Sequence, residues 1–470
     1  MSPDPNPTSA AVRNAARAEA AQYGPMQGAT RLLWGLCLLG LTLSAQAWTP
    51  HAWGTWLSLH AMSEARAEAP VRAEPLEQFL QEQGAALEGL LQHEEQWARG
   101  KVRNYPPRPE VLTYRYDKQA EPAELRRRFL MALRIHPHTP LSLHVQVLPW
   151  PASQALYGSR PALADSEVVL RPEAGGVPRK YVALREGELV SVIDVLASAA
   201  DEPDGGMDSG LWLDSGTEHG RVYGFGRQPR GTAVSGQGDQ APFHMGLFHE
   251  SPVTYASADG LRRTYAEYRM HLWQSLARHA LVNGHPYWGW RFAGWAMHYA
   301  QDLTQPYRTR FMPDKGTLGL LWVNVLDRVG ASQARVQSQQ SVARRWQLVE
   351  AYQSQSLWAA MQKGDPEHPN LKPFAQVRLD AGRMALPESG LRDRVAWQSS
   401  QQAQALDEAV AASFPSRWLD PAVPLSIDAE SLYQQMQSQR TPSLDALDQM
   451  LRDMSLQFGN VTRAVWRRLQ

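Results

Sequence analysis

The stretch Gly294-Trp-Ala-Met-His-Tyr-Ala-Gln-Asp-Leu-Thr-Gln-Pro306 decides the expected fold and the expected chemistry. His298 and Asp302 lie four residues apart, so a helix would present an imidazole and a carboxylate on the same face. Such a pair can bind zinc, because a neutral imidazole is a ligand and a carboxylate can bridge to a second ion. Pro306 ends the helix beyond the pair.

Apolar residues recur at helical spacing through most of the chain. Residues 261–282 and 286–303 are the clearest predicted helices, and more helices are expected at 400–470. Prolines, glycines and short alternating stretches interrupt the pattern at 136–188, and the glycine-rich residues 205–238 predict a long surface loop. The prediction is an all-α protein with one irregular, partly β segment.

Residues 1–47 have the pattern of a secretory leader. Arg31 precedes an apolar run from Leu32 to Leu43, and Ser-Ala-Gln-Ala47 follows it. A basic residue, about a dozen apolar residues and an Ala-x-Ala site predict cleavage after Ala47. The apolar run is too short to span a bilayer comfortably. We therefore expect a periplasmic or secreted protein whose mature chain begins at Trp48.

Charge and cysteine content limit the kinds of site that can be present. Lys and Arg number 47 and Asp and Glu number 47, so no global charge indicates nucleic acid or an anionic membrane as a partner. The single cysteine, Cys37, lies in the leader, so the mature chain has no thiolate ligand. Any metal must be held by His, Asp, Glu and backbone groups. Met1 and Met26 are alternative starts of the chain.

The string G-x-x-x-H-Y-x-x-D-x-x-Q-P at residues 294–306 resembles the metal-site helix of bacterial zinc-dependent phospholipase C and of fungal zinc single-strand nucleases. The resemblance implies a multi-helix domain over residues 48–470. An insertion at about 105–190, with no counterpart in the small phospholipases, and a helical extension at about 400–470 would be additions to that domain.

The resemblance also implies a set of metal ligands, and three of them have alternatives in this sequence. The preferred set is Trp48, His60, Asp201, His249, His298 and Asp302. The alternatives are His51 for His60, Asp204 for Asp201, and His244 for His249. In these families the mature N-terminal Trp gives its amino nitrogen and carbonyl oxygen to a zinc ion. The predicted cleavage before Trp48 is therefore a second point of resemblance.

The third zinc site of these families is broken in this sequence. Arg308 and Trp346 stand where the resemblance expects histidines, and neither side chain can bind zinc. Two zinc ions rather than three are therefore expected. Glu350 is retained, and Arg308 could replace the lost cation by pairing with it.

These residues predict an exported zinc-dependent phosphodiesterase in which a metal-bound hydroxide attacks a phosphate ester. Asp201 and Arg308 are the expected catalytic residues, with Arg308 neutralising developing charge. A phospholipid is one candidate substrate, and contact with a membrane would occur only through it. The alternative is a degenerate relative that keeps the fold and acts as an exported binding or structural protein.

Overall fold

The computed structural model describes residues 51–171, 177–229, 238–257, 259–315, 319, 333–377, 390–425 and 427–470. The chain divides into two compact units, residues 1–42 and 43–470, and every described residue belongs to the second. The predicted leader, residues 1–47, and the predicted metal ligand Trp48 lie outside the described residues. The second unit is described below.

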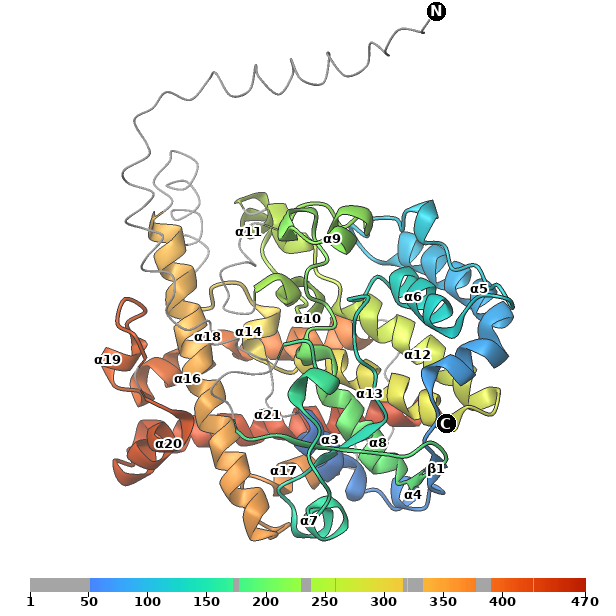
Figure 1. Cartoon of the computed structure of the whole chain (residues 1–470). Coiled ribbons are helices and arrows are strands. Elements are labelled where there is room, and N and C mark those ends of the chain that lie inside the picture. The colour runs from blue at the N-terminus through green and yellow to red at the C-terminus, as the bar shows by residue number, and fades with distance from the viewer. Residues whose placement is uncertain are drawn as a thin grey trace, which may run out of the picture. The chain divides into compact units, whose positions relative to one another are not determined.

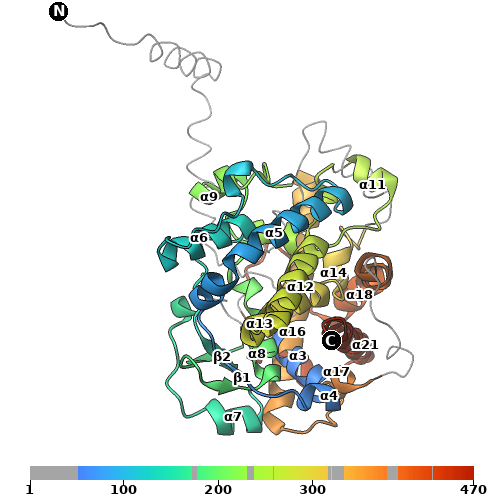
Figure 2. The same cartoon turned by 90° about the vertical axis from the view of Figure 1, so that its right-hand side faces the viewer.

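Helix α13 (Pro286–Asp302) runs through the interior of this unit (Figures 1 and 2). Every residue after Pro286 is buried, because aromatic and aliphatic side chains occur on all sides of the helix. It packs against α12 (Ala266–Val282), α8 (Val192–Asp201) and α21 (Pro442–Arg467). A Cβ atom at Gly294 would lie 2.5 Å from Cβ of Ala199, so glycine permits the close approach of α8 and α13.

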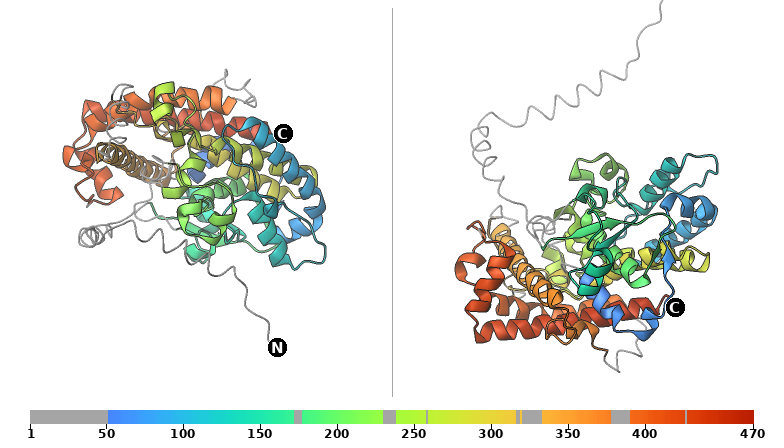
Figure 3. Two further views of the ribbon diagram at one scale, coloured as in Figure 1. Left: turned by 90° about the horizontal axis from the view of Figure 1, so that it is seen from above. Right: turned by 60° about the horizontal axis from the view of Figure 1, so that its bottom comes forward.

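Helix α3 (His51–His60) packs against both α8 and α21, which brings the first and the last described helices together (Figure 3). Helix α3 begins with His-Ala-Trp-Gly-Thr-Trp, and nine of its ten residues are buried. The start of α3 lies close to the C-terminal ends of α8 and α13 in the interior, where the backbone N–H of Ala52 donates to Asp201 and His51 lies beside Asp302.

The remaining elements surround these helices. They are α4 (Ser63–Arg66), α5 (Leu76–Lys101), η1 (Glu110–Leu112), α6 (Pro122–Leu133), α7 (Pro151–Tyr157), η2 (Asp165–Glu167), η3 (Pro203–Gly205), η4 (Leu213–Ser215), α9 (Glu218–Val222), η5 (Gly238–Gln240), α10 (Ala241–His244), α11 (Pro252–Ser257), η6 (Asp259–Arg262), α14 (Pro306–Thr309), α16 (Gln333–Lys363), α17 (Lys372–Ala375), the π-helix η8 (Leu391–Ala396), α18 (Trp397–Ser413), α19 (Ser416–Leu419) and α20 (Ala429–Ser438).

The described strands form two short antiparallel pairs. Strand β1 (Val71–Arg72) pairs with β4 (Leu189–Val190), and β2 (His144–Val147) pairs with β3 (Lys180–Ala183). Strands β2 and β3 lie in the segment 136–188, which the sequence marked as irregular and partly β, and β4 follows directly after it. The fold is thus mostly helical, as expected.

One segment differs from its prediction. Residues 205–238 were expected to form a long surface loop, but residues 205–212 are buried. Their glycines do not mark exposure here. Gly206 and Gly210 have φ angles of 106° and 71°, which let the chain turn tightly within the interior.

In the described part of the chain, no helix combines the length and the apolar character needed to cross a membrane.

Candidate metal centre

His298 and Asp302 occupy the last turns of α13, and neither side chain is exposed to solvent. The helical spacing places Nε2 of His298 3.3 Å from Oδ2 of Asp302. Nδ1 of His298 lies 2.7 Å from the carbonyl oxygen of Ala200 and donates a hydrogen bond to it. This bond fixes the tautomer in which Nε2 carries a lone pair and faces the carboxylate.

His51, the first residue of α3, is held in the same way. The amide nitrogen of Gln301 donates to the hydroxyls of Thr55 and Thr462, at 2.7 Å and 2.9 Å. The amide oxygen of Gln301 therefore remains to accept a hydrogen bond from Nδ1 of His51, 2.8 Å away. This leaves Nε2 of His51 as a lone-pair nitrogen, and it has no hydrogen-bond partner.

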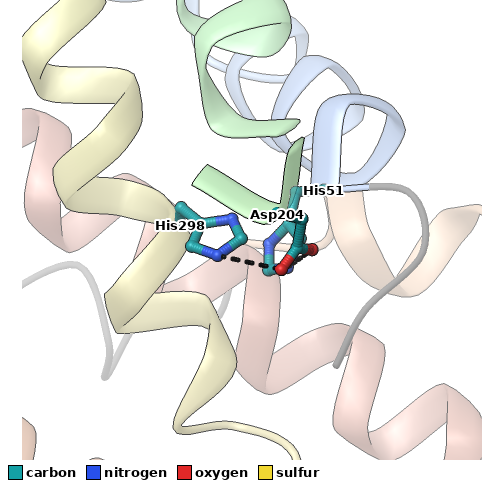
Figure 4. A group of neighbouring side chains, drawn as sticks. All are labelled: His51, Asp204 and His298. Carbon is teal, nitrogen blue, oxygen red and sulfur yellow. Dashed lines mark ion pairs between the residues drawn. The ribbon is translucent and has the colours of Figure 1, made fainter. Parts of the chain in front are cut away.

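Asp204 and His244 complete a cluster around these residues. Asp204 lies in η3, directly after α8, and His244 ends α10. Oδ2 of Asp204 lies 3.7 Å from Nε2 of His51, and Oδ1 lies 3.6 Å from Nε2 of His298. Figure 4 shows how these three side chains converge from α3, η3 and α13. Among the described residues, His51, Asp204 and His298 form one group able to hold a metal ion, and His244, His298 and Asp302 form another.

The separations within the second group suit a metal ion. Nδ1 of His244 lies 2.9 Å from Oδ2 of Asp302 and 2.9 Å from Nε2 of His298. Oδ1 of Asp204 lies 3.7 Å from Nδ1 of His244. The ligand atoms around a tetrahedral zinc ion are about 3.4 Å apart, given bonds of about 2.0–2.2 Å. His244, His298, Asp302 and Asp204 can therefore contribute to one ion.

The two carboxylates also face a second position. The other oxygen of Asp302, Oδ1, lies 3.5 Å from Nε2 of His51. Each carboxylate thus directs one oxygen toward His298 and the other toward His51. This is the arrangement in which a carboxylate bridges two neighbouring ions.

Buried polar atoms without hydrogen-bond partners indicate that a cation fits this cluster. Nε2 of His51 and Oδ1 of Asp302 are buried, lie 3.5 Å apart and have no hydrogen-bond partner. Buried polar groups are nearly always hydrogen-bonded, so two such atoms facing one another indicate a ligand that binds them. Lone-pair nitrogens and carboxylate oxygens together make a donor set for a cation.

Asp208 supports His244 from outside the cluster. Its Oδ2 lies 3.5 Å from Nε2 of His244 and accepts a hydrogen bond from the hydroxyl of Tyr299 at 2.6 Å. Its Oδ1 accepts from the buried guanidinium of Arg269 at 2.5 Å. A carboxylate behind a ligating histidine orients the ring and raises its basicity. Sequence reasoning missed Asp208 because it lies in the segment predicted to be a surface loop.

Arg308, in α14, adds a buried positive charge beside the cluster. Its side chain is 1% exposed, and Nε lies 3.9 Å from Oδ1 of Asp302. Its guanidinium lies 4.7 Å from the ring centre of Trp346. Burial lowers the pKa of Arg308, while Asp302, Asp204 and Glu350 act to raise it. Nε of Arg308 thus forms an ion pair with Asp302, while Glu350, its predicted partner, acts on Arg308 through its charge.

The charges in the cluster stabilise one another. Burial lowers the pKa of His298, but the carboxylates of Asp302 and Asp204 outweigh it and raise the pKa to about 9. Burial acts to raise the pKa of Asp302, yet His298 and Arg308 hold it well below its usual range. Asp302 is therefore ionised at neutral pH, as a metal ligand must be, whereas His298 would release its Nε2 proton when an ion binds.

The structure brings the alternatives His51 and His244 to the centre, and it places His60 and His249 elsewhere. His60 ends α3 on the exposed side and stacks on Trp56, with ring centres 4.4 Å apart. Nε2 of His249 donates to the carbonyl oxygen of Arg392 at 2.8 Å. His60 was preferred for its distance along the chain, but the side chain at the start of α3 is the one that points inward.

Asp201 also has another role than the predicted one. Its Oδ1 accepts a hydrogen bond from the backbone N–H of Ala52 at 3.0 Å, and Oδ2 lies 3.7 Å from Nε of Arg179. Asp201 thus holds the first turn of α3, the turn that carries His51, in place. Asp204, the alternative, supplies the carboxylate of the cluster.

The centre thus combines a described set of side chains, His51, Asp204, His244, His298 and Asp302, with supporting residues behind three of them. These groups could hold a metal ion. No protein-family model, curated protein or solved structure matches this chain.

Proposed function

We propose that this chain is an exported zinc-dependent phosphodiesterase with the phospholipase C-like fold that its motif resembles. The observation that carries the proposal is the orientation of His51 and His298. Each ring donates from Nδ1 to a fixed acceptor, and each Nε2 faces the carboxylates of the centre at 3.3–3.7 Å. These separations are longer than those of most hydrogen bonds and suit ligands of a shared cation.

Zinc is the metal that fits these donors. Imidazole nitrogens together with carboxylate oxygens, without cysteine, suit zinc better than calcium or magnesium, which prefer oxygen ligands. His244, His298, Asp302 and Asp204 would hold one ion. His51 and the other carboxylate oxygens would hold part of a second, to which Trp48 is proposed to contribute main-chain groups. A zinc ion supplies a Lewis acid and lowers the pKa of water toward neutrality.

Arg308 gives the proposal its substrate class. Nε and Nη1 of Arg308 are buried and have no hydrogen-bond partner, although the side chain lies against Asp302. Unpaired guanidinium donors bind oxyanions well, because their planar geometry matches phosphate oxygens. Arg308 would therefore bind a phosphoryl oxygen of the ester and neutralise charge that develops on it. The balanced charge of the whole chain gives no support to a nucleic-acid substrate.

A second candidate function is a structural or binding protein with a metal centre that does no chemistry. The burial of the centre favours it, since Asp204, at 6%, is the most exposed of the five side chains. A cation there would tie α3, η3, α10 and α13 together. Structural zinc sites contribute directly to folding stability.

Two measurements on the purified chain separate these functions. The first is metal content, and the second is hydrolysis of bis(p-nitrophenyl) phosphate and of p-nitrophenyl phosphorylcholine, before and after chelation. The phosphodiesterase proposal expects bound zinc and an activity that chelation removes and zinc restores. Bound zinc without hydrolysis of either ester would refute the enzyme and leave the structural centre. Absence of any bound metal would refute both.

Arg308→Gln tests the assigned role of Arg308. It should raise KM for the phosphodiester or lower kcat by at least about tenfold, the value of one charge-assisted hydrogen bond, with the metal content retained. Arg310→Gln is the matched control, because Arg310 pairs with Glu250 instead of the centre. Equal kinetics for both variants would remove Arg308 from the mechanism.

A further inference from the structure

A second polar site lies apart from the metal centre, in a cavity of about 60 Å³ between the segment after α10 and the start of η8. Three arginines line it, Arg103, Arg262 and Arg392, together with one carboxylate, Glu267. None of these four residues belongs to the metal centre. Three guanidinium groups around one small cavity indicate that it accommodates negative charge.

The single carboxylate is already engaged. Glu267 accepts a hydrogen bond from Nη2 of Arg392 and forms an ion pair with it. Arg103 and Arg262 form no ion pair with any residue in the described part of the chain. Nε of Arg262 and Nε of Arg392 are buried and lack a hydrogen-bond partner. Leaving such donors unpaired in a buried position is costly, so a ligand that accepts from them would be bound.

Aromatic rings hold two of the guanidinium groups in place. Arg262 lies 4.2 Å from the ring centre of Tyr255, and Arg392 lies 5.0 Å from that of Phe248. The hydroxyl of Tyr255 donates to the carbonyl oxygen of Leu247 at 2.6 Å, which fixes the ring. Stacking restricts each guanidinium plane and leaves its edge for hydrogen bonds in that plane. The donors are therefore preorganised for a ligand.

We propose that this cavity binds a small oxyanion of the phosphate class, held by Arg103, Arg262 and Arg392. Its volume exceeds the space that a single water needs and suits a small tetrahedral anion. The anion is either free phosphate or the terminal phosphate of a monoester. The proposal does not depend on the metal centre, because the two sites share no residue.

The test uses the full chain after chelation and inorganic phosphate as the probe, with calorimetry at low salt. Arg262→Gln should weaken phosphate binding by at least about tenfold, the loss expected for a charged hydrogen-bond donor. Arg103→Gln should weaken it in the same direction, and Arg103 is exposed, so this variant is expected to fold normally. Arg115→Gln is the control for charge alone, because Arg115 is an exposed arginine paired with Glu110.

Three further arms locate the bound anion and identify its source. Phosphate binding that Arg262→Gln weakens and that Arg308→Gln does not remove would place the anion in the arginine cavity. Glycerol 3-phosphate binding as tightly as free phosphate would identify a monoester end, and binding of free phosphate alone would identify the free ion. The proposal is overturned if phosphate does not bind, if Arg262→Gln and Arg103→Gln bind it as the wild type does, or if only Arg308→Gln removes binding.

Discussion

Replacing Asp302 by Asn is the most direct test of the metal centre. The change keeps the volume and removes the charge of a residue that faces the three histidines of the cluster and also Arg308. Its Oδ2 lies near His244 and His298, and its Oδ1 lies near His51 and Arg308. Both proposed ions would therefore lose a ligand. His298→Ala removes a ligand from the first position and leaves the oxygens that face His51.

The expected magnitude follows from this geometry. Losing a residue that only supports a metal ligand lowers metal affinity by about 10–100-fold. Asp302 is a direct ligand at both positions, so Asp302→Asn should lower zinc affinity by more than about 100-fold, or about 2.7 kcal/mol. The metal-free protein should also be less stable, by about 3–5 kcal/mol, because His298 and Arg308 lose the carboxylate between them.

The assay is zinc content by mass spectrometry, combined with calorimetric titration of the dialysed chain. Asp453→Asn is the matched control, because Asp453 lies exposed on α21, far along the chain from the centre. Asp302→Asn should contain no zinc after dialysis, and His298→Ala should contain less than the wild type. If both variants kept the wild-type zinc content, the cluster would be structural and the assignment of its ligands would be wrong.

Three other predictions test the supporting structure. His51→Ala should lose zinc whereas His60→Ala, on the same helix, should not, as metal analysis of the two variants would reveal; equal losses would contradict the orientation of α3. Gln301→Leu should weaken zinc binding by about 10–100-fold without removing a ligand, since it frees Nδ1 of His51; unchanged affinity in calorimetry would contradict this. His136, whose pKa is lowered to about 4 by burial and by His219 and His138, stays neutral in the folded chain. Its contribution to stability is therefore present above about pH 6.5 and is lost as the pH falls toward 4, so His136→Gln should flatten this part of the pH–stability profile.

The sequence predicted the helices well because a helix is set mainly by the spacing of apolar residues that are close along the chain. The residues of α13 form a helix, are buried and place His298 and Asp302 on one face, all of which follows from residues near one another in the sequence. The His51 and His244 positions depend instead on how α3 and α10 pack against α13. Nothing local to His60 shows that the end of α3 is exposed, so spacing along the chain selected the wrong histidine.

The amino-acid composition of residues 203–208 did not reveal that this segment contributes side chains to the metal centre. Glycines and aspartates usually indicate exposed turns, and the same residue types here form a tight buried turn that carries Asp204 and Asp208. The one sequence signal that could have found both is their spacing after Asp201, with three aspartates in eight residues. Burial of that turn is a tertiary property, set by the close packing of α8 against α13.

The charge of the centre makes a final prediction about how many zinc ions it holds. Glu350 lies near enough to affect the pKa of Arg308, so it belongs to the charge balance of the centre. With one divalent ion, the carboxylates of Asp204, Asp302 and Glu350 and the guanidinium of Arg308 leave no net charge. With two ions the excess is two positive charges. Uncompensated charge is costly in a buried site. We therefore expect the second ion to bind strongly only together with an anion.

Zinc stoichiometry measured with and without an added phosphate ester analogue tests this expectation. The wild type should bind one ion tightly, and a second ion tightly only when the anion is present. Arg308→Gln removes one positive charge, so it should bind the second ion more tightly in the absence of the anion, while Arg310→Gln should behave as the wild type. If the analogue left the stoichiometry of every variant unchanged, the charge of Arg308 would not control the second position. In that case the proposed contact between Arg308 and a phosphoryl oxygen would lose its electrostatic basis.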